Sequence, residues 1–75
     1  MTLLDVLQQV NRETEIDVRV KFVIKDIPYD LFVGRCLWEH GELISIDGDD
    51  YSLDMPVESY KDREEYIVVW VGGEW

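Results

Sequence analysis

Apolar residues recur at every third or fourth position near the start of this chain, from Leu3 to Val10. This spacing places them on one face of a helix. Thr2 precedes them, and Asp5 follows Thr2 by three positions, which is the pattern of a capping box at a helix N-terminus. We therefore predict one amphipathic helix over residues 2–12.

The hydrophobic period changes to two in the next segment, Glu15–Lys25. Five apolar residues alternate there with mostly charged ones: Ile16, Val18, Val20, Phe22 and Ile24. Strict alternation is typical of a strand with one buried face. Because the other face is mostly charged, we expect a sheet with one face in water and the other covered by the N-terminal helix.

Two further strands are predicted at Leu31–Trp38 and Leu43–Ile46. We predict a turn at residues 26–30 before the first of them, because Pro28 cannot donate a hydrogen bond to a neighbouring strand. Gly34 interrupts the same strand, which indicates a β-bulge or a close approach of two backbones.

The acidic segment at residues 47–50, Asp-Gly-Asp-Asp, is typical of a hairpin loop. The loop could comprise two residues or all four. A four-residue loop places Ile46 opposite Tyr51 and Ile44 opposite Leu53, so that apolar side chains pair across the hairpin. We predict this register, since the shorter loop would place an aspartate opposite Ile46.

The remaining segments complete the predicted fold. Asp54–Arg63 is polar and is predicted as a connection, with a helical turn after Pro56 as an option. Glu65–Val71 is apolar on both faces, which favours a central strand or one covered by a partner. We thus expect a single α+β domain over residues 1–75, in which one N-terminal helix packs on a mostly antiparallel sheet of four to five strands.

Charge narrows the range of functions. The chain has 17 acidic and 7 basic residues, a formal net charge of −10. Residues 1–38 hold six acids and five bases, whereas residues 39–75 hold eleven acids and only two bases, Lys61 and Arg63. This excess disfavours direct binding to nucleic acid or to an anionic membrane, and it favours a basic partner protein.

The composition also indicates the cellular compartment of the protein. Apolar residues make up 47% of the chain, enough for one core in a domain of this size. The first ten residues lack the basic start and apolar run of a secretory signal. A single cysteine, Cys36, is compatible with a reducing compartment, so we expect a cytoplasmic protein.

Candidate chemistry is sparse. Cys36 and His40 are the only residues of their types, which excludes an internal disulfide and a cysteine-rich zinc site. A calcium loop beginning at Asp47 would place Tyr51 and Ser52 where an oxygen ligand and a glycine are needed. No glycine-rich phosphate loop occurs. We therefore predict no catalytic residue, metal or cofactor, and a non-enzymatic protein.

The predicted partner-binding surface combines carboxylates with tryptophan. Trp75 follows two glycines, where burial in its own domain is difficult, and an exposed Trp beside acids has the composition of an interface hot spot. Alternatively, Trp75 folds back over the core. The residues predicted to bind a partner are Asp47, Asp49, Asp50, Asp54, Glu58, Asp62, Glu64, Glu65, Trp70 and Trp75.

The chain also resembles a group of known proteins. Its helix opened by Thr-Leu-Leu, its alternating strand Ile16–Ile24 and its apolar last strand Tyr66–Val71 resemble those of small acidic proteins from phages and mobile elements of Gram-positive bacteria, anti-CRISPR proteins among them. The resemblance implies inhibition of a nucleic-acid enzyme by occupation of its basic groove.

Two hypotheses follow for the function. In the first, the carboxylates stand in for phosphates and the protein occupies a basic groove of a nucleic-acid-binding protein. In the second, the protein is a small homo-oligomeric structural or assembly protein, the last strand pairs across a dimer, and acidity serves only solubility.

Overall fold

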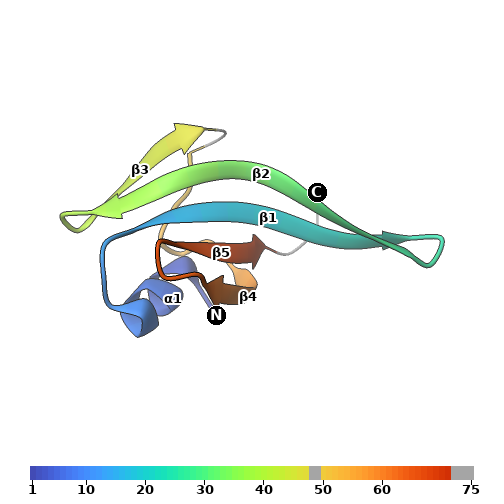
Figure 1. Cartoon of the computed structure of the whole chain (residues 1–75), viewed down its shortest axis with the longest axis horizontal. Helices are drawn as coiled ribbons and strands as arrows, with labels where there is room; N and C mark the ends of the chain where they lie inside the picture. The colour runs from blue at the N-terminus through green and yellow to red at the C-terminus, as the bar shows by residue number, and fades with distance from the viewer. Residues whose placement is uncertain (48–49, 72–75) are drawn as a thin grey trace.

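The sheet has one parallel strand pair in an otherwise antiparallel arrangement (Figure 1). The structure, a computed structural model, describes residues 1–47 and 50–71. Within these ranges the strand order is β3-β2-β1-β5-β4, and only β1 and β5 run parallel. The predicted α+β class, with one N-terminal helix and a mostly antiparallel sheet, is confirmed. The elements are α1 Leu3–Val10, β1 Thr14–Ile24, β2 Ile27–Glu39, β3 Glu42–Asp47, β4 Val57–Asp62 and β5 Tyr66–Val71.

Helix α1 begins with the predicted capping box. The Thr2 side chain accepts a hydrogen bond from the Asp5 amide at 3.2 Å, and the Thr2 amide donates to the Asp5 carboxylate at 2.8 Å. The helix ends at Val10, two residues earlier than predicted, because Asn11 adopts a left-handed conformation with φ of 56°. Its buried residues, Leu3, Val6 and Leu7, face the sheet.

The core lies between α1 and the centre of the sheet. Strand β5 lies between β1 and β4, so the prediction of a central last strand is confirmed. Both edges of β5 are therefore paired within the chain, and this strand is not available to pair across a dimer. The register aligns buried residues of β1 with those of β5, in the pairs Ile16–Ile67, Val18–Val69 and Val20–Val71.

Strand β2 begins at Ile27, so the predicted turn at residues 26–30 is wrong. The turn consists of Lys25 and Asp26 alone, both with positive φ, as a type I′ hairpin turn requires. Pro28 is tolerated within β2 because, one residue beyond the closing pair of a two-residue turn, its nitrogen faces away from β1.

The bulge predicted at Gly34 is present. Val18 of β1 pairs with Gly34, but the next residue of β1, Arg19, pairs with Phe32. Val33 is thus the additional residue of the bulge, and it packs against the core.

The chain after β3 differs from the prediction. Residues 51–53 form no strand, so the predicted pairing of Ile46 with Tyr51 is wrong, and Gly48 and Asp49 lie outside the described residues. The segment instead follows the start of α1, where carbonyls of Leu53 and Met55 accept the amides of Leu4 and Leu3. These bonds satisfy helix amides that have no partner inside the helix.

The predicted connection at Asp54–Arg63 contains strand β4 instead. Val57 and Tyr60 of this strand lie opposite Val71 and Val69 of β5. Val57 is buried and Tyr60 is partly buried against the core, and this packing outweighs the polar character of the segment as a whole.

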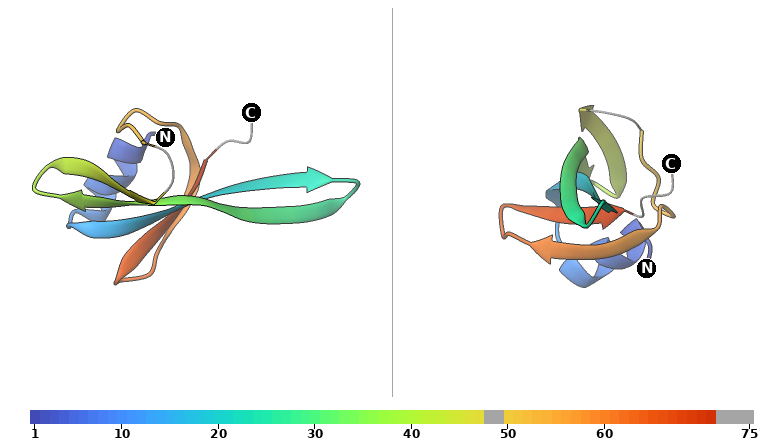
Figure 2. Two further views of the ribbon diagram at one scale, coloured as in Figure 1. Left: turned by 90° about the horizontal axis from the view of Figure 1, so that it is seen from above. Right: turned by 90° about the vertical axis from the view of Figure 1, so that its right-hand side faces the viewer.

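The β1–β2 hairpin extends well beyond the rest of the sheet (Figures 1 and 2). The pairing of β1 with β5 ends at Val20, and the pairing of β2 with β3 begins at Arg35. The molecule is consequently elongated, with extents of 42 × 22 × 21 Å. We call the projecting part, Lys21–Leu31, the arm.

Candidate protein-interaction surfaces

The predicted carboxylates are exposed but lie on several elements. Asp47 ends β3, Glu58 belongs to β4, and β3 and β4 are the two opposite edges of the sheet. The others are distributed between the segment before β4, with Asp50 and Asp54, and the end of β4 with its turn into β5, with Asp62, Glu64 and Glu65. Asp49 and Trp75 lie outside the described residues.

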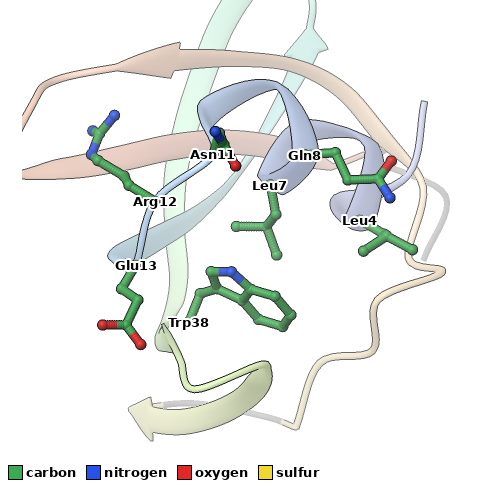
Figure 3. A pocket seen from close by; sticks show the side chains of 7 residues that line it. All are labelled: Leu4, Leu7, Gln8, Asn11, Arg12, Glu13 and Trp38. Carbon is green, nitrogen blue, oxygen red and sulfur yellow. The ribbon is translucent and has the colours of Figure 1, made fainter.

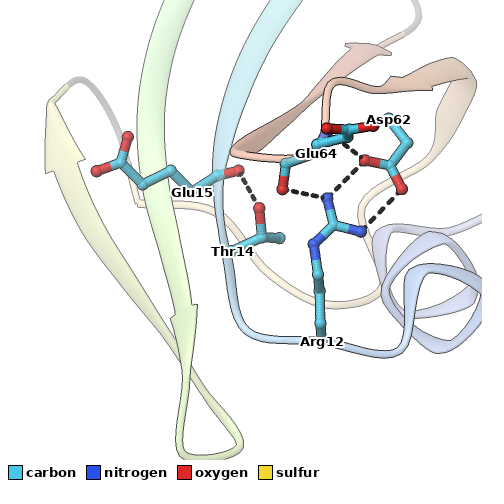
Figure 4. Close-up of polar contacts among 5 residues, drawn as sticks. All are labelled: Arg12, Thr14, Glu15, Asp62 and Glu64. Atoms are coloured by element: carbon cyan, nitrogen blue, oxygen red, sulfur yellow. Dashed lines mark hydrogen bonds and ion pairs between the residues drawn. The ribbon is translucent and has the colours of Figure 1, made fainter.

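One of these carboxylates, Asp62, is bound by an arginine of the same chain (Figure 4). Arg12 makes two hydrogen bonds to the Asp62 carboxylate, at 2.8 and 2.5 Å, and a third to the Glu64 carbonyl at 2.9 Å. Asp62 also accepts the Glu64 amide at 2.8 Å. The Arg12 guanidinium, followed by that amide, lowers the pKa of Asp62 to about 2. This contact joins the end of α1 to the β4–β5 turn.

The Asp62 contact gives a pH-dependent contribution to stability. Because the pKa of Asp62 is lower in the folded protein than its ordinary value of 3.8, the contribution is complete above about pH 4 and is lost as the pH falls toward about 2. We expect Asp62→Asn to be less stable than the original protein at neutral pH and to approach it over this window. Urea midpoints across the pH range measure this. Arg12→Gln should behave in the same way, and an unchanged difference at low pH would contradict the assignment.

Ion pairing is uneven over the molecule. Two other arginines bind carboxylates within the β1–β2 hairpin, Arg19 with Asp30 at 2.8 Å and Arg35 with Asp17 at 2.9 Å. Seven described carboxylates of the second half have no basic side chain of the described chain within ion-pair distance: Glu42, Asp47, Asp50, Asp54, Glu58, Glu64 and Glu65. The hairpin thus largely neutralises its own acids, whereas the second half keeps an exposed negative charge.

Trp70 lies on the sheet face opposite α1 and contacts the base of the arm. Lys21 places its ammonium 4.0 Å from the centre of the Trp70 ring, and the indole nitrogen donates to Asp30 at 3.2 Å. Hydrogen bonds from Arg19 and, to a smaller extent, Trp70 lower the pKa of Asp30. The structure therefore groups Trp70 with the hairpin rather than with the carboxylates of the second half. The strand register, which places Arg19, Lys21 and Asp30 on one face, is the signal that could have shown this.

The arm is a second surface, which the sequence interpretation missed. Phe22 and Tyr29 stack at 5.2 Å, and with their neighbours they line a shallow depression of about 480 Å³. Large apolar side chains on and beside the arm are exposed: Val23, Ile24, Ile27, Tyr29, Leu31 and Phe32. The alternation of apolar and polar residues over Ile16–Ile24 indicated an apolar strand face here. The turn predicted at residues 26–30, however, made the expected hairpin shorter than the observed one.

A second hollow, of about 300 Å³, lies between α1 and the end of β2 (Figure 3). Leu7 and Trp38 face each other across it, and Glu13 and Arg12 lie toward one end. Arg12 is already bound to Asp62, and Glu13 accepts the His40 amide at 2.6 Å. The hollow is a small apolar depression with few polar groups free to bind a ligand.

Cys36 and His40 occupy different environments. Cys36 is completely buried in the core, and this burial raises the pKa of its thiol to about 11, so the thiol is protonated at neutral pH. A buried, protonated thiol is a poor nucleophile. His40 is exposed in the β2–β3 turn, with Nε2 3.1 Å from Glu39. Across residues 1–47 and 50–71, no three His, Cys, Asp or Glu side chains gather closely enough to hold a metal.

Comparison with known proteins identified no relative of this chain. No protein-family model, curated protein or solved structure matches this chain. In the described part of the chain, no helix has the length and apolar character needed to span a bilayer. Functional inference therefore depends on the two surfaces described above, the unpaired carboxylates and the arm.

Proposed function

We propose that this protein is a non-enzymatic binding module that presents carboxylates to a basic site on a partner protein. The observation that carries the proposal is the uneven ion pairing. The three paired arginines use Asp17, Asp30 and Asp62. Seven exposed carboxylates of the second half, Asp50, Glu58 and Glu65 among them, therefore have no ion-pair partner within the described chain. Charge of one sign that is not neutralised internally attracts a partner of the opposite sign.

The partner class that fits is a nucleic-acid-binding protein. Such proteins bind phosphates with Lys and Arg, and carboxylates held on a folded domain can occupy the same groups. The module would act as an inhibitor by filling the groove, which agrees with the role implied by the resemblance to phage-encoded acidic proteins. Self-assembly is the second candidate function, and the arm favours it.

Affinity for the partner is expected to fall steeply with salt. In a pull-down from host lysate, a nucleic-acid-binding protein should be retained at ~50 mM salt and lost at ~500 mM, because exposed charge pairs are screened. Duplex DNA should compete for the captured protein. Equal retention at both salt concentrations would contradict the proposal.

Two variants of equal net charge locate the surface. Glu58→Gln with Glu65→Gln removes two unpaired carboxylates, and we expect it to weaken binding roughly 2- to 30-fold, from the range for exposed ion pairs. Glu15→Gln with Asp26→Asn removes the same charge from β1 and the arm turn, and it should leave binding nearly unchanged. Equal weakening by both pairs would show a response to net charge alone.

A further inference from the structure

We propose that the arm is a dimerisation element that packs against the arm of a second copy of this chain. The starting point is the lack of any covering layer. Beyond Val20, neither β5 nor β3 continues alongside the hairpin, and the arm consists of two strands only. An isolated two-stranded hairpin is at best marginally stable in water, whereas a hairpin packed against another layer is stable.

The apolar face of the arm continues the core face of the sheet. Val20 is 5% exposed and pairs with Leu31, which is 49% exposed. The pairs Phe22–Tyr29 and Ile24–Ile27 follow on the same face. Ile24 and Ile27 are 51% and 54% exposed at the tip. The face that α1 covers in the body of the molecule is therefore uncovered along the arm, and a second copy would supply the missing layer.

The β2 edge of the arm favours packing through this face over extension of the sheet. On β2, the residues whose backbone groups point outward are Pro28, Asp30 and Phe32, by alternation from the turn. Pro28 has no amide hydrogen, and Asp30 is bound to Arg19 and Trp70. A proline and a charged residue on an edge strand oppose pairing with another strand.

The distribution of charge over the molecule favours a second copy of this chain as the partner that covers the arm. The arm contains two basic and two acidic residues and is therefore neutral as a whole, whereas the rest of the chain contains five basic and fifteen acidic ones. A basic partner would be attracted to the acidic body rather than to the neutral arm, and nucleic acid would be repelled by the molecule as a whole. Two copies approach each other with least repulsion through their arms. In a two-fold arrangement each tip, with Lys25, reaches the acidic body of the other copy.

The oligomeric state of the purified protein tests this proposal, which is independent of the basic partner. We expect sedimentation to show a monomer–dimer equilibrium that shifts with concentration. Amide chemical shifts should change with concentration in the arm and not in β4. A monomer at all concentrations, or concentration-dependent shifts confined to β3 or β4, would overturn the proposal. Arm-dependent capture of another protein by a strictly monomeric chain would overturn it as well.

Matched variants in the arm and in β3 test whether the dimer interface lies on the arm. Ile24→Lys with Ile27→Lys should weaken dimerisation at least tenfold. Ile44→Lys with Ile46→Lys should not, although these β3 residues are similarly exposed, at 44% and 51%, and the charge change is the same. Circular dichroism checks that each variant is folded, and Ile27→Lys alone serves if the double arm variant is not. Equal weakening by the arm and β3 variants would exclude the arm as the interface.

Discussion

Replacement of Ile67 with alanine is expected to lower the free energy of unfolding by about 2–5 kcal/mol. Ile67 is completely buried in the central strand β5, where it lies beside Ile16 of β1. Truncation leaves a cavity in the layer between the sheet and α1. A domain of this length is stabilised by only about 4–11 kcal/mol, so the change removes a large share of the total.

The control is the same substitution at Ile44. This residue is 44% exposed on the edge strand β3, and its truncation should cost about 1 kcal/mol or less. Urea unfolding followed by circular dichroism measures both variants. A loss at Ile44 equal to that at Ile67 would mean that the core has been assigned to the wrong residues.

The second large effect is expected at Leu3. Its side chain is completely buried, and Leu3→Ala should cost about 2–5 kcal/mol through loss of contact between α1 and the sheet. Its amide donates to the Met55 carbonyl at 3.0 Å, and alanine keeps this bond. The predicted loss therefore comes from the side chain alone.

Leu4 provides a neighbouring control. It is 37% exposed in the same turn of α1, and its amide is also hydrogen bonded, to the Leu53 carbonyl at 2.9 Å. Leu4→Ala changes helix propensity by the same small amount, so the difference between the two variants reports burial. Thermal melting should separate them by roughly 4–8 °C per kcal/mol. Equal melting temperatures would show that α1 does not cover the sheet with this face.

Local sequence signals predicted α1, β1 and β5 well. The capping box, the five alternating apolar residues of β1 and the two apolar faces of Tyr66–Val71 each report a burial environment that depends mainly on neighbouring residues. Strand β4 was missed because only Val57 and Tyr60 of its residues pack against the core. Their burial comes from β5, which follows in sequence, so the segment itself carries little hydrophobic period.

The surfaces were predicted less completely than the fold. Composition located the excess of acid in the second half, but the pairing of Arg12 with Asp62 joins residues fifty positions apart and depends on the tertiary fold. The arm was missed for a different reason. Pro28 was interpreted as part of a turn, although an outward-facing position on an unpaired strand edge accepts proline without loss of a hydrogen bond.

The parallel pairing of β1 with β5 determines the order in which the molecule can fold. The hairpins β1–β2 and β2–β3 join neighbouring segments and can form early. The part of the sheet that α1 covers, however, is incomplete until β5 inserts between β1 and β4. Strand β5 pairs with β1, which lies about fifty residues earlier in the sequence. Such distant pairing slows folding, because a long loop must close before its contacts form. On the ribosome, the edge of β1 that pairs with β5 therefore stays unpaired until Val71 has emerged.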